Sequence, residues 1–179
     1  MVIFRLNGDR ADYLVLADSV LVLDQAEDVP LVITDQREVT TRRRFLAAMN
    51  AAITDTPEYH HARDQYIEAL RAHRNQPGGF WVAKDNPQAA SEALTGSRPI
   101  RDLASAALLS NGASRIVDRF GLADWTEVLA LLDTEGPSEI IRRVREADTN
   151  NSYRAQWPHG ETHDDATLAH YTELREWRR

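Results

Sequence analysis

Residues 13–23 read Tyr-Leu-Val-Leu-Ala-Asp-Ser-Val-Leu-Val-Leu, two short apolar runs separated by the polar pair Asp18-Ser19. Apolar runs of this length, rich in branched side chains and bounded by turn-forming residues, are typical of β-strands. A third run, Val29–Thr34, follows after a polar turn. Because these runs are almost continuously hydrophobic, we expect strands of an antiparallel sheet that is buried on both faces, with another layer packed over each side.

The rest of the chain combines helical and strand patterns. Apolar residues recur with a helical period or form short buried runs, and glycine and proline mark several boundaries. The patterns predict helices over 38–53, 57–73, 87–94, 113–120, 125–132 and 137–147, strands over 80–83, 104–109 and 165–171, and a polar loop over 148–160. The sequence contains neither an internal repeat nor a low-complexity linker. We therefore expect residues 1–179 to form a single α+β domain in which helices cover the sheets.

Composition excludes several classes of protein. The chain has 179 residues, of which 42% are hydrophobic and 27% charged, as in a soluble globular protein. Its first residues lack the pattern of a signal peptide, and no apolar run is long enough to cross a membrane, so we expect a cytoplasmic protein without a membrane partner. The absence of cysteine excludes disulfides, thiolate metal sites and cysteine nucleophiles. A net charge of −7 argues against a nucleic-acid partner.

The segment with the most candidate ligands is Gly160–Asp165, which reads Gly-Glu-Thr-His-Asp-Asp and precedes a predicted strand. Carboxylates at the end of a strand are suitable ligands for hard divalent cations, which prefer oxygen. His159 and His163 indicate zinc as an alternative. The segment is also compatible with a simple polar turn, in which the aspartates cap nearby backbone amides.

Several short segments, taken in their order along the chain, resemble the metal-dependent protein serine/threonine phosphatases of the protein phosphatase 2C type, particularly bacterial members. The segment Leu108–Arg115 resembles the Leu-Ser-Asp-Gly motif of that family, and His163–Thr167 resembles its closing Asp-Asn/Asp-x-Thr motif. Leu16–Ser19 resembles the family's Gly-Asp-Ser turn between two strands, Ile33–Asp35 resembles the segment that follows it, and Gly78–Ala83 resembles bacterial members. The match extends over nearly the whole chain, although each motif is short.

The resemblance implies a fold and a chemistry. The family fold is an antiparallel β-sandwich flanked by helices (α-β-β-α), which here would be truncated at its N-terminus. Family members hold two divalent cations, usually manganese or magnesium, whose bridging water attacks the phosphoryl group. The resemblance implies that Asp164 is a retained metal ligand and that Asn111, a neutral oxygen donor, replaces an aspartate ligand. Only sixteen residues precede Ala17, and the chain contains no Asp-Gly dipeptide, so the family's earlier metal motifs lack a counterpart.

Three functional interpretations follow, and none of them identifies the catalytic residues. In the first, the chain is a phosphatase of phosphoproteins that is weak or inactive, because Asp164 alone cannot hold two cations; an active form would need further carboxylates, with Asp18 and Asp35 as candidates. In the second, the chain is a pseudophosphatase that binds a protein partner. In the third, it is an unrelated zinc hydrolase that uses His159, His163 and Asp164.

The expected loss of N-terminal strands also has a consequence for assembly. A sheet that lacks strands exposes an edge or apolar surface that a second copy of the chain could cover. We therefore expect a homodimer, and elution as a clean monomer in size-exclusion chromatography would contradict this expectation.

Overall fold

The fold was analysed in a computed structural model that describes all residues except 27, 54, 151–163 and 177–179. The chain divides into two compact units, each built from several segments. The helical unit comprises Met1, Leu16–Asp18 and Asp35–Ala93, and the two-sheet unit comprises Val2–Val15, Ser19–Thr34 and Leu94–Arg179.

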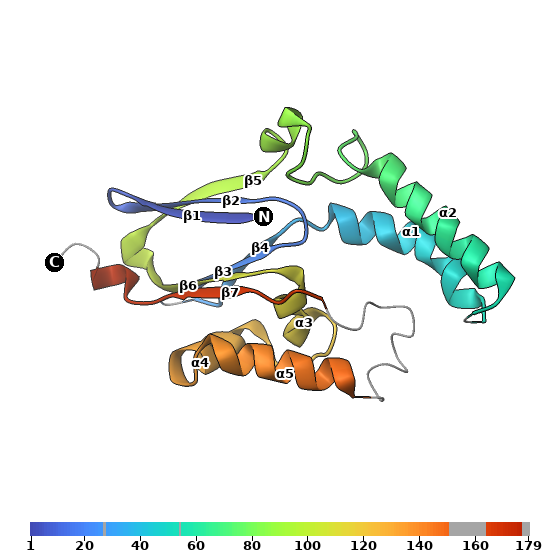
Figure 1. Cartoon of the computed structure of the whole chain (residues 1–179). Helices are drawn as coiled ribbons and strands as arrows, with labels where there is room; N and C mark the ends of the chain where they lie inside the picture. Colours follow the sequence, from blue (N-terminus) through green and yellow to red (C-terminus); the bar gives the residue numbers. More distant parts are fainter. Residues whose placement is uncertain (27, 54, 151–163, 177–179) are drawn as a thin grey trace. The chain divides into compact units, whose positions relative to one another are not determined.

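Two antiparallel sheets form the two-sheet unit (Figure 1). The three-stranded sheet has the order β1-β2-β5, with β1 at Val2–Asn7, β2 at Arg10–Val15 and β5 at Leu94–Pro99. The four-stranded sheet has the order β4-β3-β6-β7, with β4 at Leu31–Thr34, β3 at Val20–Gln25, β6 at Leu103–Leu109 and β7 at Leu168–Tyr171. The two apolar runs of residues 13–23 thus contribute to different sheets, and Ala17, with φ of 60°, lies in the turn between them.

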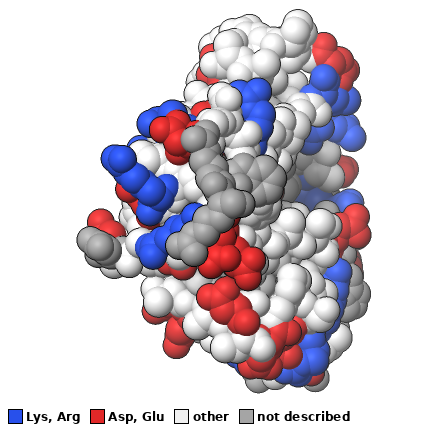
Figure 2. All heavy atoms as spheres, turned by 90° about the vertical axis from the view of Figure 1, so that its left-hand side faces the viewer, with Lys and Arg blue, Asp and Glu red and all other residues white. Residues whose placement is uncertain are grey.

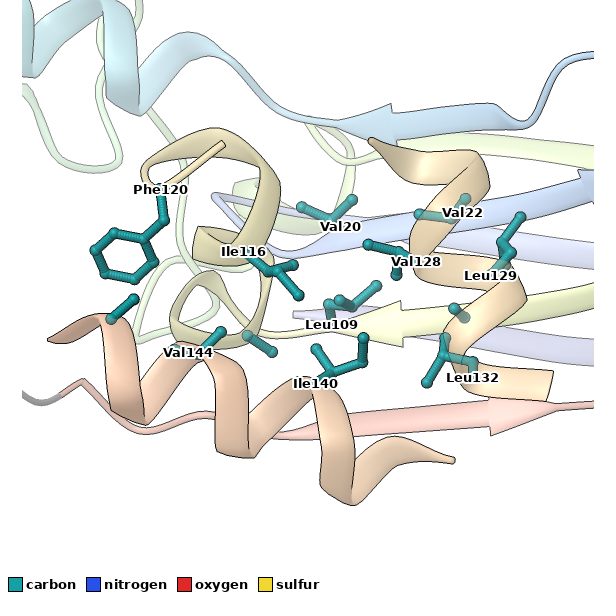
Figure 3. Close-up of a cluster of buried hydrophobic side chains, with 13 residues drawn as sticks. Val20, Val22, Leu109, Ile116, Phe120, Val128, Leu129, Leu132, Ile140 and Val144 are labelled. Atoms are coloured by element: carbon teal, nitrogen blue, oxygen red, sulfur yellow. The ribbon is translucent and has the colours of Figure 1, made fainter. Parts of the chain in front are cut away.

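The strand β3 explains why these runs are hydrophobic on both faces. Val20 and Val22 belong to a core cluster with the helices α3 (Asn111–Asp118), α4 (Trp125–Thr134) and α5 (Pro137–Thr149) (Figure 3). Leu21 and Leu23 belong to a second cluster that includes residues of both sheets. Each of the four side chains is at most 1% exposed, so the predicted burial on both faces is confirmed.

The helical unit contains α1 (Arg37–Ala51) and α2 (Pro57–His73), which pack against each other (Figure 1). Thr56 caps α2 by accepting a hydrogen bond from the backbone N–H of Tyr59, and Pro57 occupies the first helical position. Before α1, the buried Asp35 accepts hydrogen bonds from both the backbone and the guanidinium of Arg37. Arg37 also pairs with Glu92 at 2.9 Å, so these contacts connect the start of the unit with its end.

The α+β class is confirmed, since the described residues form two antiparallel sheets and five α-helices. Two predicted strands and one predicted helix differ from the structure. In place of the helix over 87–94 there is only a short 3₁₀ helix, and Leu94 already belongs to β5. Phe80–Ala83 forms no strand; Phe80 makes a single bridge with Arg74, and its hydrophobicity reflects burial in the helical unit. The last predicted strand begins later, at Leu168. Conversely, β5 was not predicted, because its sequence Leu-Thr-Gly-Ser-Arg-Pro is poor in apolar residues.

Three short 3₁₀ helices complete the secondary structure that the structure describes. They lie at Pro87–Ala90, Ile100–Asp102 and Leu174–Glu176, and the second leads directly into β6. Among the described residues, none of the helices has the length and apolar character needed to cross a membrane.

Charged side chains on the surface pair locally. Glu139 accepts hydrogen bonds from Arg142 and Arg143 at 2.6 Å, and these contacts lower the pKa of Glu139 to about 2. Figure 2 shows basic side chains in several separate groups with acidic ones among them. On that face, the charges therefore do not form one continuous basic field of the kind that binds a phosphate backbone.

Candidate functional site

The two segments that carry most of the resemblance, Leu108–Arg115 and the residues from Asp164 to Thr167, lie side by side. The hydroxyl of Ser110 donates to the carbonyl of Asp165 at 3.1 Å and accepts from the backbone N–H of Thr167 at 2.9 Å. A Cβ atom at Gly112 would lie 2.5 Å from the Asp165 carbonyl oxygen, so this close approach requires glycine. The start of α3, which includes Asn111, thus adjoins the segment that contains Asp164.

An ion pair fixes the carboxylate of Asp164. The Nη2 atom of Arg115, a residue of α3, donates to Asp164 Oδ2 at 2.9 Å. The other oxygen, Oδ1, accepts from the backbone N–H of Asp165 at 2.9 Å. The Arg115 side chain is 10% exposed and that of Asp164 is 31% exposed, so the pair lies at the border of the interior. Both oxygens of Asp164 are therefore hydrogen-bonded to N–H donors.

Two further charged residues extend this ion pair, and both come from α5. Asp148 is 2% exposed, and its Oδ1 lies 3.6 Å from Arg115 Nη1. Its Oδ2 has no hydrogen-bond partner in the described part of the chain and lies 3.7 Å from Arg145 Nη1. Arg145 donates in turn to the carbonyl oxygen of Asp164 at 2.7 Å. We call Arg115, Arg145, Asp148 and Asp164 the arginine–aspartate cluster; its two positive and two negative charges balance.

The described residues do not fit the two-cation centre that the resemblance implies. Within them, no group of three or more His, Asp or Glu side chains is arranged to hold a metal ion. Asp164 faces a buried guanidinium, whose fixed positive charge repels a cation at the same carboxylate. We therefore derive no metal-dependent step.

The other candidate ligands belong to a different unit from Asp164 or lie outside the described residues. Asp35 is held by Arg37, and both Asp35 and Asp18 belong to the helical unit, whereas Asp164 belongs to the two-sheet unit. His159 and His163 lie outside the described residues.

Sequence analysis missed the partners of Asp164. In the sequence, Arg115 is the last residue of the Leu108–Arg115 segment, and the pattern predicts a polar loop that includes Asp148. In the structure, Asp148 lies in the last turn of α5 and is buried. An acidic side chain is unfavourable there, because the C-terminal end of a helix carries a partial negative charge. The last turn of α5 contains no basic residue, and the charge of Asp148 is compensated by Arg115 of α3 and by Arg145, one turn earlier in α5.

A second group of titratable side chains lies at the far end of the helix-covered sheet. The His170 side chain on β7 is 5% exposed, and its Nε2 atom has no hydrogen-bond partner among the described residues. Asp133 Oδ1, from α4, lies 3.7 Å from this atom. Asp24 on β3 interacts with Ser105 at 3.4 Å and with His170 electrostatically. Burial lowers the pKa of His170, although Asp133 and Asp24 oppose this effect.

This arrangement predicts a pH-dependent loss of stability. Because the pKa of His170 is lower in the folded chain than its unfolded value of about 6.5, the unfolded state binds more protons. The free energy of unfolding should therefore fall as the pH drops below about 6.5. The decrease due to His170 should end once the pH is below the pKa of the folded state. Urea unfolding of the wild type and of His170→Gln between pH 5 and 8 measures this contribution.

The matched control is the exposed His60, replaced by glutamine. We expect His170→Gln to flatten the pH dependence and His60→Gln to leave it unchanged. Asp24, whose pKa is raised chiefly by burial and also by Asp133, contributes with the opposite sign at more acidic pH. An unchanged profile in His170→Gln would contradict the prediction.

A comparison of the chain with protein-family models gives no match. A comparison with curated proteins also gives none.

Proposed function

We propose that the chain is a protein phosphatase 2C-like domain that does not hydrolyse phosphoproteins through a two-metal centre and serves instead as a protein-binding, regulatory module. The observation that carries this proposal is the ion pair between Arg115 and Asp164. Asp164 is the carboxylate ligand that the sequence resemblance retains. Its negative charge is balanced by a guanidinium of the chain itself.

The physical argument concerns charge. Two divalent cations bring four positive charges, which a two-metal centre balances with several carboxylates. At the position implied for a second ligand, Asn111 is neutral. The arginine–aspartate cluster is already balanced, and a cation beside Asp164 would have to displace Arg115, whose side chain is 90% buried. Displacement would leave the buried Asp148 with Arg145 alone, at 3.7 Å.

The fold supports the resemblance at a coarse level. Two antiparallel sheets share a core cluster, and α3, α4 and α5 pack on the other face of the four-stranded sheet. The proposal includes the finer α-β-β-α arrangement of the phosphatase family.

Hydrolysis of p-nitrophenyl phosphate with and without manganese tests the proposal. We expect no manganese-dependent turnover in the wild type, and we expect Asp164→Ala to behave identically. Asp165→Ala, which changes an exposed neighbouring carboxylate, is the matched control. Titration calorimetry with manganese alone should show no binding. Manganese-dependent turnover that Asp164→Ala abolishes and Asp165→Ala preserves would contradict the proposal and favour a working phosphatase.

The same assay with zinc distinguishes the zinc-hydrolase interpretation from the proposed non-catalytic module. Zinc-dependent turnover that is lost in His163→Ala would favour a zinc site made by His159, His163 and Asp164. We expect neither zinc nor manganese to produce turnover.

A further inference from the structure

The strand β1 has an open edge along its whole length. It pairs with β2 over six consecutive residues without a bulge, and no other strand of its sheet lies beyond it. Met1 and Leu16 exchange two backbone hydrogen bonds and are therefore a hydrogen-bonded pair. From there along β1, residues that exchange hydrogen bonds with the opposite strand alternate with residues that do not. The N–H and C=O groups of Val2, Phe4 and Leu6 therefore point away from β2, and they have no hydrogen-bond partner within the described residues.

The other edge strands that the structure describes are less suited to pairing with another strand. β4 and β7 contain four residues each. β5 contains Gly96 and Pro99, residues that weaken or interrupt strand pairing. β1 has neither glycine nor proline, and its inward side chains are all apolar. Of the features by which proteins usually protect an edge, it has only one exposed charge, Arg5, which is ion-paired with Asp12.

The side chains along this edge are incompletely covered. Val2, Phe4 and Leu6 pack against the cluster shared by the two sheets but are only half-buried. The Phe4 ring lies 6.4 Å from the ring of Tyr171 on β7. Ile3, on the opposite face of β1, is 48% exposed. An additional strand beside β1 would cover apolar surface as well as satisfy backbone groups.

We propose that β1 pairs with β1 of a second copy of this chain, in antiparallel orientation, across a two-fold axis that passes beside Phe4. In this register Phe4 lies opposite Phe4 of the second copy, and Val2 lies opposite its Leu6. These three residues carry the outward-pointing backbone groups, so every one of those groups on both copies finds a partner. A two-fold axis pairs a strand with itself antiparallel, which makes the contact closed and self-complementary.

Charge is compatible with this pairing. On the exposed face, Ile3 lies opposite Arg5 of the second copy. Arg5 is ion-paired with Asp12 at 3.0 Å within its own chain, so its charge is compensated. The register places no like charges directly opposite each other. Two three-stranded sheets would thereby join into one continuous sheet.

Sedimentation velocity over a range of concentrations tests the proposal. We expect the wild type to form a dimer with a dissociation constant below about 100 µM. Ile3→Lys places a lysine opposite Arg5 of the second copy and should weaken the dimer about tenfold, whereas Ile3→Glu places a carboxylate there and should strengthen it about tenfold. Because Ile3 is exposed, circular dichroism should show both variants folded. A monomer at all concentrations, or a dimer that neither variant affects, would overturn the proposal.

Cross-linking tests the register independently. The chain lacks cysteine, so a single introduced thiol reports one position. Opposed residues in this register have Cα atoms about 5.5 Å apart, within the range that a disulfide bridges. Phe4→Cys should therefore form a disulfide-linked dimer. Ile3→Cys is the control, because its counterpart is diagonal, about 7–8 Å away, and should cross-link slowly. Equal cross-linking at both positions would overturn the register.

Discussion

Replacing Arg115 with alanine should lower the free energy of unfolding by about 3–5 kcal/mol, because it leaves buried negative charge without a partner. The Arg115 side chain contacts both Asp148, which is 2% exposed, and Asp164. Asp148 Oδ2 already lacks a hydrogen-bond partner among the described residues. The loss of Arg115 would leave Asp148 with Arg145 alone, at 3.7 Å. Urea unfolding at neutral pH measures the change.

A double-mutant cycle distinguishes lost charge compensation from lost packing. Asp148→Asn removes the buried negative charge, so the double variant Arg115→Ala/Asp148→Asn should be less destabilised than the sum of the two single variants. Arg143→Ala, at a more exposed position on α5, should cost little and serves as the control. Additive effects of the two single variants would show that Arg115 and Asp148 do not interact.

Replacing the neighbouring Ile116 with alanine should also destabilise the chain, by about 2–5 kcal/mol, but through a cavity. Ile116 is 0% exposed and lies in the core that β3 and β6 share with the three C-terminal helices (Figure 3). Ile116→Val removes one methylene and should cost only about 0.5–1.5 kcal/mol. Unlike that of Arg115→Ala, the effect of Ile116→Ala should be additive with Asp148→Asn. A cost below that of the valine variant would mean that α3 is not tightly packed on the sheet.

The parts of the fold that sequence predicts are those where local hydrophobicity and burial agree. β3 was predicted because Val20–Leu23 is buried on both faces, and α2 because Thr56 and Pro57 mark its start. β5 was missed because pairing with β2, rather than hydrophobicity, determines its structure. Phe80–Ala83 was misassigned for the converse reason: its large side chains are buried without forming a strand.

The candidate site shows a different limit of sequence reasoning. The two motifs around Asn111 and Asp164 were located from the sequence, and the structure places their segments side by side through Ser110. The partner of Asp164 was not predicted, because ion pairing between Arg115 and a residue 49 positions later depends on tertiary packing. Local patterns describe which residue types are present but not which cation meets which carboxylate.

The topology of the four-stranded sheet has a consequence for how the chain folds during synthesis. β3 pairs with β4 through a short connection, yet Val20 also pairs with Leu109, and β7 joins the sheet last, at Leu168–Tyr171. The hydrophobic strand β3 is therefore made long before the ribosome has delivered its second neighbour. Until then, one of its edges and the face that packs against α3, α4 and α5 lack their native cover. Such a delay slows folding and exposes the nascent chain to aggregation, so chaperones that bind extended apolar segments should engage residues 20–34.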